Sequence, residues 1–142
     1  MTIVWRDKMS VGNDAIDQDH KYLFCLINMV ELSLQTPVKK DQLLTVMNMM
    51  LEYTEEHFSR EEKMQLSIQY SRYDTHKIAH QNLLQKAKDI IDEVSQINTD
   101  AEFEQESDRI VTFLRAWIIE HVLKEDMLMK PLLKKFPTNW KI

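Results

Sequence analysis

The 142-residue chain contains only one glycine, three prolines and one cysteine. Because glycine and proline make most tight turns, their scarcity argues against a β-sandwich or a barrel and favours long helices. The single cysteine, Cys25, excludes a framework of internal disulfides and fits a reducing compartment. No apolar run approaches the roughly 18 residues of a membrane span, and the first residues lack the apolar core of a signal peptide. We therefore expect a cytoplasmic protein that has no membrane partner.

Positive charge is also in short supply. The chain has 18 lysine and arginine residues against 23 aspartate and glutamate residues, which gives a net charge of −5. A nucleic-acid-binding protein would carry a basic face, so we expect no nucleic acid among the partners. The length suits one domain with a sizeable core but not two, and we expect a single domain over residues 1–142.

Helix-start signals divide the chain into four expected helices. The expected N-caps are Asp17, Thr36, Ser71 and Thr99, and the helices are expected to end near residues 34, 64, 94 and 131. Pro37 would take the first position of the second helix. Such helices, joined by short links, predict an all-α fold, namely an up-down-up-down four-helix bundle over about residues 19–133. An extended N-terminal arm (1–18) would precede the bundle and a C-terminal tail (134–142) would follow it.

Each expected helix carries apolar residues at steps of three, four or seven, a spacing that places them on one face. All the histidines of the chain fall in phase with these stripes: His20, His57, His76, His80 and His121. Glu61 follows His57 by four residues on the same face. The stripe of the last helix runs through Ile110, Leu114, Trp117, His121 and Leu128. The pattern therefore predicts five histidines and a carboxylate inside the core.

A single histidine on an apolar face is usually a hydrogen-bonded core residue. Five buried imidazoles would each need a donor and an acceptor, and a buried unpaired carboxylate costs several kcal/mol or forces protonation. A metal ion removes both difficulties, because it takes the lone pairs of the imidazoles and the charge of the carboxylate together. The candidate ligands are too many for one ion and about right for two.

Several well-known metal sites do not fit this pattern. Structural zinc favours cysteine and histidine ligands, and the chain has one cysteine. The zinc-protease motif needs a glutamate directly after its first histidine, whereas this chain has HKIAH. Ferritin-like di-iron sites use Glu-x-x-His, which no histidine here satisfies. A site rich in imidazole and poor in carboxylate suits a redox pair that binds a ligand.

The segments VGNDAIDQDH, HFSREEKM, HKIAH and WIIEHVLKED resemble those of the hemerythrins, most closely the single-domain bacteriohemerythrins. The resemblance runs from Trp5 to about Leu133. It implies a cofactor of two iron ions (Fe2+/Fe3+) with an oxo or hydroxo bridge. The implied ligands are His76, His80 and His121 on one iron, His20 and His57 on the other, and Glu61 and Asp126 bridging both. Dioxygen would bind at an open position of the two-histidine iron, beside a pocket wall made by Leu23, Phe58, Trp117 and Ile118.

One implied ligand conflicts with regular helix geometry. Asp126 follows His121 by five residues, about 140° round a regular helix, whereas Glu125 stands at the better spacing of four. Spacing alone would choose Glu125. The family pattern chooses Asp126 and implies a local widening of the helix there.

The resemblance implies reversible dioxygen binding for storage, delivery or buffering. We expect a monomer that is not an enzyme. A protein that accepts the oxygen is a further possible partner. One alternative is a di-iron enzyme that decomposes peroxide or acts on nitric oxide, although no histidine remains as a proton donor. Another is an oxygen or redox sensor, in which the arm around Trp5 or the tail KKFPTNWKI changes its contacts.

Overall fold

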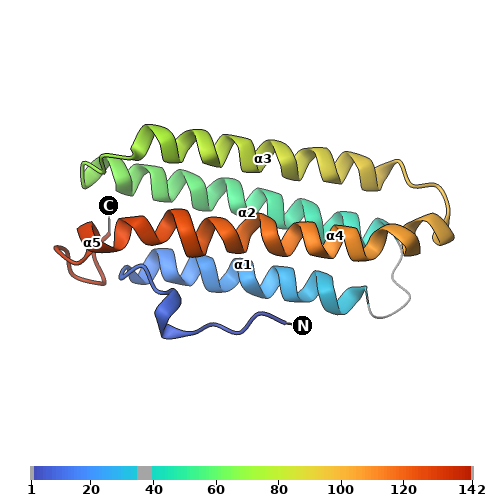
Figure 1. Cartoon of the computed structure of the whole chain (residues 1–142), viewed down its shortest axis with the longest axis horizontal. Coiled ribbons are helices and arrows are strands. Elements are labelled where there is room, and N and C mark those ends of the chain that lie inside the picture. The colour runs from blue at the N-terminus through green and yellow to red at the C-terminus, as the bar shows by residue number, and fades with distance from the viewer. Residues whose placement is uncertain (1, 35–39, 142) are drawn as a thin grey trace.

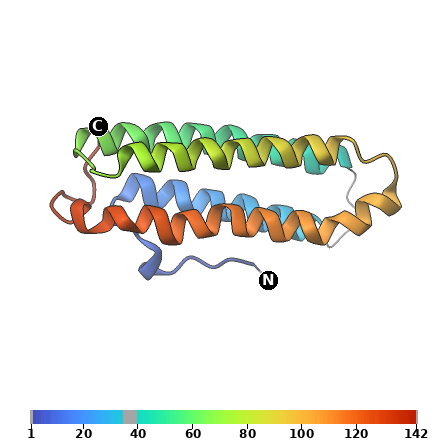
Figure 2. The ribbon, with the colours of Figure 1, turned by 45° about the horizontal axis from the view of Figure 1, so that its top comes forward.

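The computed structural model describes residues 2–34 and 40–141 and shows a bundle of four long helices (Figure 1). The helices are α1 (Asp14–Ser33), α2 (Lys40–Ser67), α3 (Tyr73–Ser95) and α4 (Asp100–Glu120). Successive helices run in opposite directions. In a second view, the pair α2 and α3 lies above the pair α1 and α4 (Figure 2). The described residues contain no strand. The predicted all-α fold, an up-down four-helix bundle, is confirmed.

The last helix does not simply stop at the end of α4. It continues as a π-helical turn, η2 (His121–Glu125), a 3-10 turn, η3 (Asp126–Met129), and a short helix, α5 (Lys130–Leu133). A 3-10 turn, η1 (Asp7–Met9), lies in the N-terminal arm. Among the described residues, no helix is both long enough and apolar enough to cross a membrane.

The predicted start of the first helix is wrong. The N-cap is Asn13, whose side chain accepts a hydrogen bond from the Ile16 N–H, so α1 begins four residues before the expected position. Asp17, the expected cap, lies inside the helix. Its carboxylate turns back and accepts hydrogen bonds from the Ser10 hydroxyl and the Val11 N–H. Asp17 therefore anchors the arm to α1 instead of capping it.

The other expected caps have different outcomes. Thr99 is confirmed, since its side chain accepts a hydrogen bond from the Glu102 N–H at 3.1 Å. Ser71 is not the cap of α3, because the helix begins after Arg72, which forms no side-chain capping bond. The chain reverses at Gln69, in a left-handed conformation with φ of 56°, before α3 starts. The expected cap at Thr36 and Pro37 lies outside the described residues.

A polar layer divides the core of the bundle into two apolar clusters. The larger cluster fills the bundle between the four long helices and includes Leu23, Phe58 and Ile118. The smaller one lies at the end where α1 begins and α5 ends, and includes Ile16 and Met129. All five predicted histidines and Glu61 are buried along the same helices, between positions that belong to the two clusters. Apolar packing on both sides therefore separates this polar layer from solvent.

The predicted stripe of the last helix fails at one position. Leu128 is 46% exposed, whereas the next residue, Met129, is fully buried. The π-helical turn after His121 explains the shift, because a wider turn adds one residue before the same face returns.

Candidate metal centre

Seven side chains from all four long segments of the bundle meet in the polar layer. His20 comes from α1, His57 and Glu61 from α2, His76 and His80 from α3, His121 from η2 and Asp126 from η3. Each of the seven is no more than 5% exposed. The structure thus brings together all seven residues that the sequence indicated as ligands.

Their ligand atoms form two groups, and within each group these atoms lie within 4.8 Å of one another. One group contains His76, His80, His121, Glu61 and Asp126. The other contains His20, His57, Glu61 and Asp126. The two carboxylates belong to both groups, so this buried histidine–carboxylate cluster is consistent with a di-metal site.

Each shared carboxylate divides its two oxygens between the groups. Glu61 places Oε1 2.8 Å from His76 Nε2 and Oε2 3.1 Å from His57 Nε2. Asp126 places Oδ1 2.9 Å from His121 Nε2 and Oδ2 3.0 Å from His20 Nε2. This is the geometry that a carboxylate bridging two ions requires.

The donor atoms also fit metal ions better than they fit one another. Among the described residues, Nε2 of His20, His57 and His76, Oε2 of Glu61 and both carboxylate oxygens of Asp126 are buried without a hydrogen-bond partner. Buried polar atoms without partners are rare in proteins. Two ligands at right angles, each about 2.1 Å from an ion, lie about 3 Å apart. The contacts of 2.8–3.1 Å between imidazole nitrogens and carboxylate oxygens match this spacing.

Two further carboxylates hold the outer nitrogens of two histidines. His57 Nδ1 lies 3.0 Å from Asp19 Oδ2, and His80 Nδ1 lies 2.9 Å from Glu62 Oε1. Donation from Nδ1–H fixes the tautomer and turns the Nε2 lone pair towards the cluster. Burial lowers the pKa of His80 to about 3, which favours the neutral form of its ring.

Asp19 has further donors besides His57. It accepts a hydrogen bond from the Tyr53 hydroxyl at 2.6 Å and two from Arg60, at 3.0 and 2.9 Å. Burial alone would raise the pKa of the Asp19 carboxyl, but these donors hold that pKa well below its usual range. Sequence reasoning missed Asp19 and Glu62 because their histidine partners lie 38 and 18 residues away. Tyr53 and Arg60 gave only a weak signal, as they stand at helical spacing from His57.

The π-helical turn η2 decides between the two candidate carboxylates at its end. His121 and Asp126 both face the cluster, while Glu125 points outward to within 4.0 Å of Arg72. The widening that the family pattern implied is present in the structure. It brings the residue five positions after His121, rather than four, to the same face.

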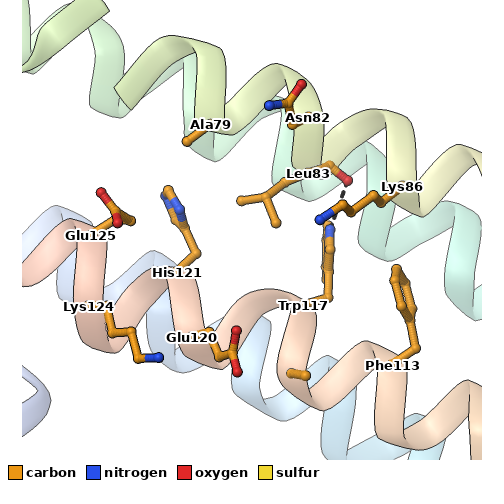
Figure 3. Close-up of a pocket in the computed structure, with 11 residues that line it drawn as sticks. Ala79, Asn82, Leu83, Lys86, Phe113, Trp117, Glu120, His121, Lys124 and Glu125 are labelled. Atoms are coloured by element: carbon orange, nitrogen blue, oxygen red, sulfur yellow. Dashed lines mark hydrogen bonds between the residues drawn. The ribbon is translucent and has the colours of Figure 1, made fainter. Parts of the chain in front are cut away.

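The four residues expected to wall the oxygen pocket are all buried in the larger apolar cluster. Phe58 stacks on the His80 ring with a centroid distance of 3.7 Å. The Trp117 indole N–H donates to the Leu83 carbonyl oxygen at 2.8 Å, across from α4 to α3 (Figure 3). A hollow of about 450 Å³ has Trp117 and His121 in its wall, but Leu23, Phe58 and Ile118 do not line it (Figure 3). The role of Leu23, Phe58, Trp117 and Ile118 as an oxygen pocket stays a prediction.

Known proteins are similar to this chain in sequence over most of its length. The family model for the hemerythrin HHE cation binding domain matches residues 11–133. A bacteriohemerythrin of Clostridium acetobutylicum is 32% identical over 126 residues, which cover 87% of this chain and 95% of that protein. A bacteriohemerythrin of Stenotrophomonas maltophilia is 26% identical over 124 residues, covering 87% of this chain and 76% of that protein. A hemerythrin-like protein of Naegleria gruberi is 25% identical over 129 residues, covering 91% and 92%. No solved structure matches the chain at a significant level.

The bundle and its buried cluster define a helical protein with a cation-binding centre. The chain belongs to the hemerythrin family, as the resemblance of its four motifs predicted. All seven residues of the cluster lie inside the matched segment.

Proposed function

We propose that this protein binds dioxygen reversibly at a di-iron centre, with His20, His57, His76, His80, His121, Glu61 and Asp126 as the ligands. The observation that carries the proposal is the unequal size of the two ligand groups, five residues against four, with two shared. Three histidines would hold one ion and two histidines the other, with both carboxylates shared, so the smaller group would leave room for an exogenous ligand such as dioxygen.

Iron is the metal that this donor set and the family favour. Imidazole nitrogen suits iron as well as zinc and copper, and carboxylate bridges suit a pair of hard ions. When bound, two ferrous ions supply the electrons that hold dioxygen. Glu61 and Asp126 bring two negative charges into a buried layer and so offset much of the charge of the ions.

Four buried apolar side chains near the centre would limit the access of water to it. Leu23 and Ile118 are fully buried, and Phe58 and Trp117 are nearly so. In such a dry layer, moving a proton or an anion in or out is costly. This cost favours reversible binding, because it would hinder the entry of protons and the release of reduced oxygen, which would leave the iron in the ferric state.

The proposal is a binding protein rather than an enzyme. All five histidines of the chain belong to the cluster, so none remains to donate protons during peroxide turnover. A peroxide-consumption assay on the iron-loaded protein tests this part, and steady turnover would contradict it.

The visible spectrum tests the main proposal. Iron-loaded ferrous protein, prepared without oxygen, is measured before oxygen, after oxygen and after purging with argon. We expect a colourless form that gains a visible band with oxygen and loses it on purging. Direct conversion to a stable ferric spectrum, unchanged by argon, would contradict reversible binding.

A further inference from the structure

A second cavity, of about 440 Å³, is lined by α1, α2 and the C-terminal tail, whereas α3 and the last helix line the hollow beside Trp117. The first turns of α1 and the last turns of α2 form its walls, and Trp140 and Lys141 of the C-terminal tail complete its lining. The tail is held in place by two hydrogen bonds. The Asp14 N–H donates to the Thr138 carbonyl at 2.8 Å, and the Asn13 side-chain amide donates to the Trp140 carbonyl at 2.9 Å. The cavity is therefore built by ordered segments, with Trp140 as part of its wall.

Cations dominate the polar part of this cavity. Arg60, Lys63 and Lys141 line it together with a single carboxylate, Asp19. Asp19 is already used by its own donors, His57, Tyr53 and Arg60. Among residues 2–34 and 40–141, the ammonium groups of Lys63 and Lys141 form no ion pair. In a chain of net charge −5, this is a local excess of positive charge that is not neutralised.

The rest of the lining is apolar. Ile16 and Met64 are buried side chains of the smaller apolar cluster, and the Trp140 ring packs against that cluster. Cavities of about 300–1,000 Å³ with apolar walls and a few charged groups are typical small-molecule sites. The apolar floor and the cationic rim together select a molecule that has both an apolar body and a negative head.

We propose that this cavity binds a small organic anion, an aryl or alkyl monocarboxylate. Its carboxylate lies between Lys63 and Lys141, and its apolar body lies against Ile16, Met64 and Trp140. Neither half alone is sufficient, because an inorganic anion leaves the apolar floor unused and a neutral molecule leaves the lysines unpaired.

Arg60 connects this cavity to the metal centre. It lines the cavity and donates two hydrogen bonds to Asp19, which in turn accepts the bond from His57 Nδ1. A bound carboxylate near Arg60 competes with Asp19 for the guanidinium group and so changes the environment of His57. This coupling rests on the proposed function, whereas the anion site itself does not. If the anion shifts oxygen affinity, oxygenation must shift anion affinity by the same factor.

Calorimetric titration of the iron-loaded protein tests the site with 4-phenylbutyrate as the probe. We expect binding at one molecule per chain, and binding at least about tenfold weaker for inorganic phosphate and for 4-phenylbutanol. Lys63→Glu together with Lys141→Glu should weaken 4-phenylbutyrate binding at least about tenfold, since two ion pairs become repulsions. The matched control is Lys86→Glu together with Lys124→Glu, at the hollow beside Trp117, which should leave this affinity unchanged.

Three outcomes would overturn the anion site: no binding of 4-phenylbutyrate, equal binding of phosphate, or equal loss in both double variants. Thermal melting shows whether the variants fold. The coupling is read separately, as a change in oxygen affinity when 4-phenylbutyrate saturates the protein. An unchanged oxygen affinity overturns the coupling alone, and a failure of reversible oxygenation leaves the binding result intact.

Discussion

The two histidine–carboxylate pairs that flank the metal centre differ in how firmly the carboxylate is held. Asp19, which orients His57, accepts hydrogen bonds from Tyr53 and twice from Arg60 as well. Among the described residues, Glu62, which orients His80, forms a hydrogen bond with that ring alone, and burial raises the pKa of its carboxyl. His57 belongs to the group of four ligands and His80 to the group of five. The ligand group with fewer members is thus the one with the stronger external support.

This difference has a physical reason in the proposed function. An ion with a vacant position has one ligand fewer to fix its geometry, so each remaining imidazole must be better oriented. The guanidinium of Arg60 also keeps Asp19 ionised beside the cavity. Glu62 needs no such partner, because three histidines and two carboxylates already surround the ion that His80 would bind.

Removal of a shared carboxylate should have the largest effect, because both ligand groups lose a member at once. For Asp126→Ala we expect metal content to fall from two iron ions per chain to fewer than one. Glu125→Ala is the matched control, since that neighbouring carboxylate points away from the cluster. Elemental analysis after iron loading measures both variants. Two ions in Asp126→Ala, or equal losses in the two variants, would contradict the assignment of Asp126.

Asp19→Ala and Glu62→Ala test the comparison directly. Loss of a carboxylate that orients a metal-binding histidine typically costs about 10–100-fold in metal affinity. We expect the larger loss for Asp19→Ala, and we expect it to affect one of the two ions first. Competition with a chelator, followed by the visible spectrum, measures both. In metal-free protein, Asp19→Ala should cost about 2–3 kcal/mol of unfolding free energy, against about 1 kcal/mol for Glu62→Ala. Equal effects of the two variants would contradict the inference that Asp19 supports His57 more strongly than Glu62 supports His80.

Ile118→Thr tests the role of the apolar residues beside the centre, because it leaves the metal ligands intact. A hydroxyl in this fully buried position admits a hydrogen-bonding group beside the centre, so we expect conversion to the ferric form to speed up about tenfold. Ile119→Thr is the control, because Ile119 is only partly buried. The rate is followed by the visible spectrum in air. An unchanged rate in Ile118→Thr would contradict the proposal that the wall keeps oxygen binding reversible.

Much of the centre could be predicted from the sequence because the ligands follow helical spacing. His57 and Glu61 stand four residues apart, as do His76 and His80, and this spacing can be recognised from the sequence without a structure. Asp126 could be reached only through the family pattern, since a π-helical turn shifts it away from the regular position. The same turn moved Leu128 out of the core and Met129 into it. Hydrogen-bond competition explains the miss at Asp17, whose carboxylate binds the arm while Asn13 caps α1.

Contacts between distant segments left no signal in the sequence. Asp19 meets His57 only because α1 packs against α2, and Glu62 meets His80 only because α2 packs against α3. The cavity that the tail helps to line depends on the hydrogen bond from Asn13 to the Trp140 carbonyl, across 127 residues of sequence. Spacing along one helix therefore predicts ligands, whereas the support of those ligands comes from packing between helices.

Tyr53→Phe should give the smallest effect, because it removes one of the donors to Asp19 and keeps the others. The lost hydroxyl donates a 2.6 Å hydrogen bond to a largely buried carboxylate, so we expect about 1 kcal/mol less unfolding free energy. Tyr22→Phe is the matched control. The centroid of the Tyr22 ring lies 4.4 Å from that of the Tyr53 ring, but the Tyr22 hydroxyl does not bind Asp19. Chemical denaturation of metal-free protein measures both variants. Because Arg60 still holds Asp19 in place, the iron affinity of Tyr53→Phe, measured by chelator competition, should fall less than about threefold. A loss of iron affinity as large as that of Asp19→Ala would show that Tyr53, not Arg60, is the main support of the carboxylate.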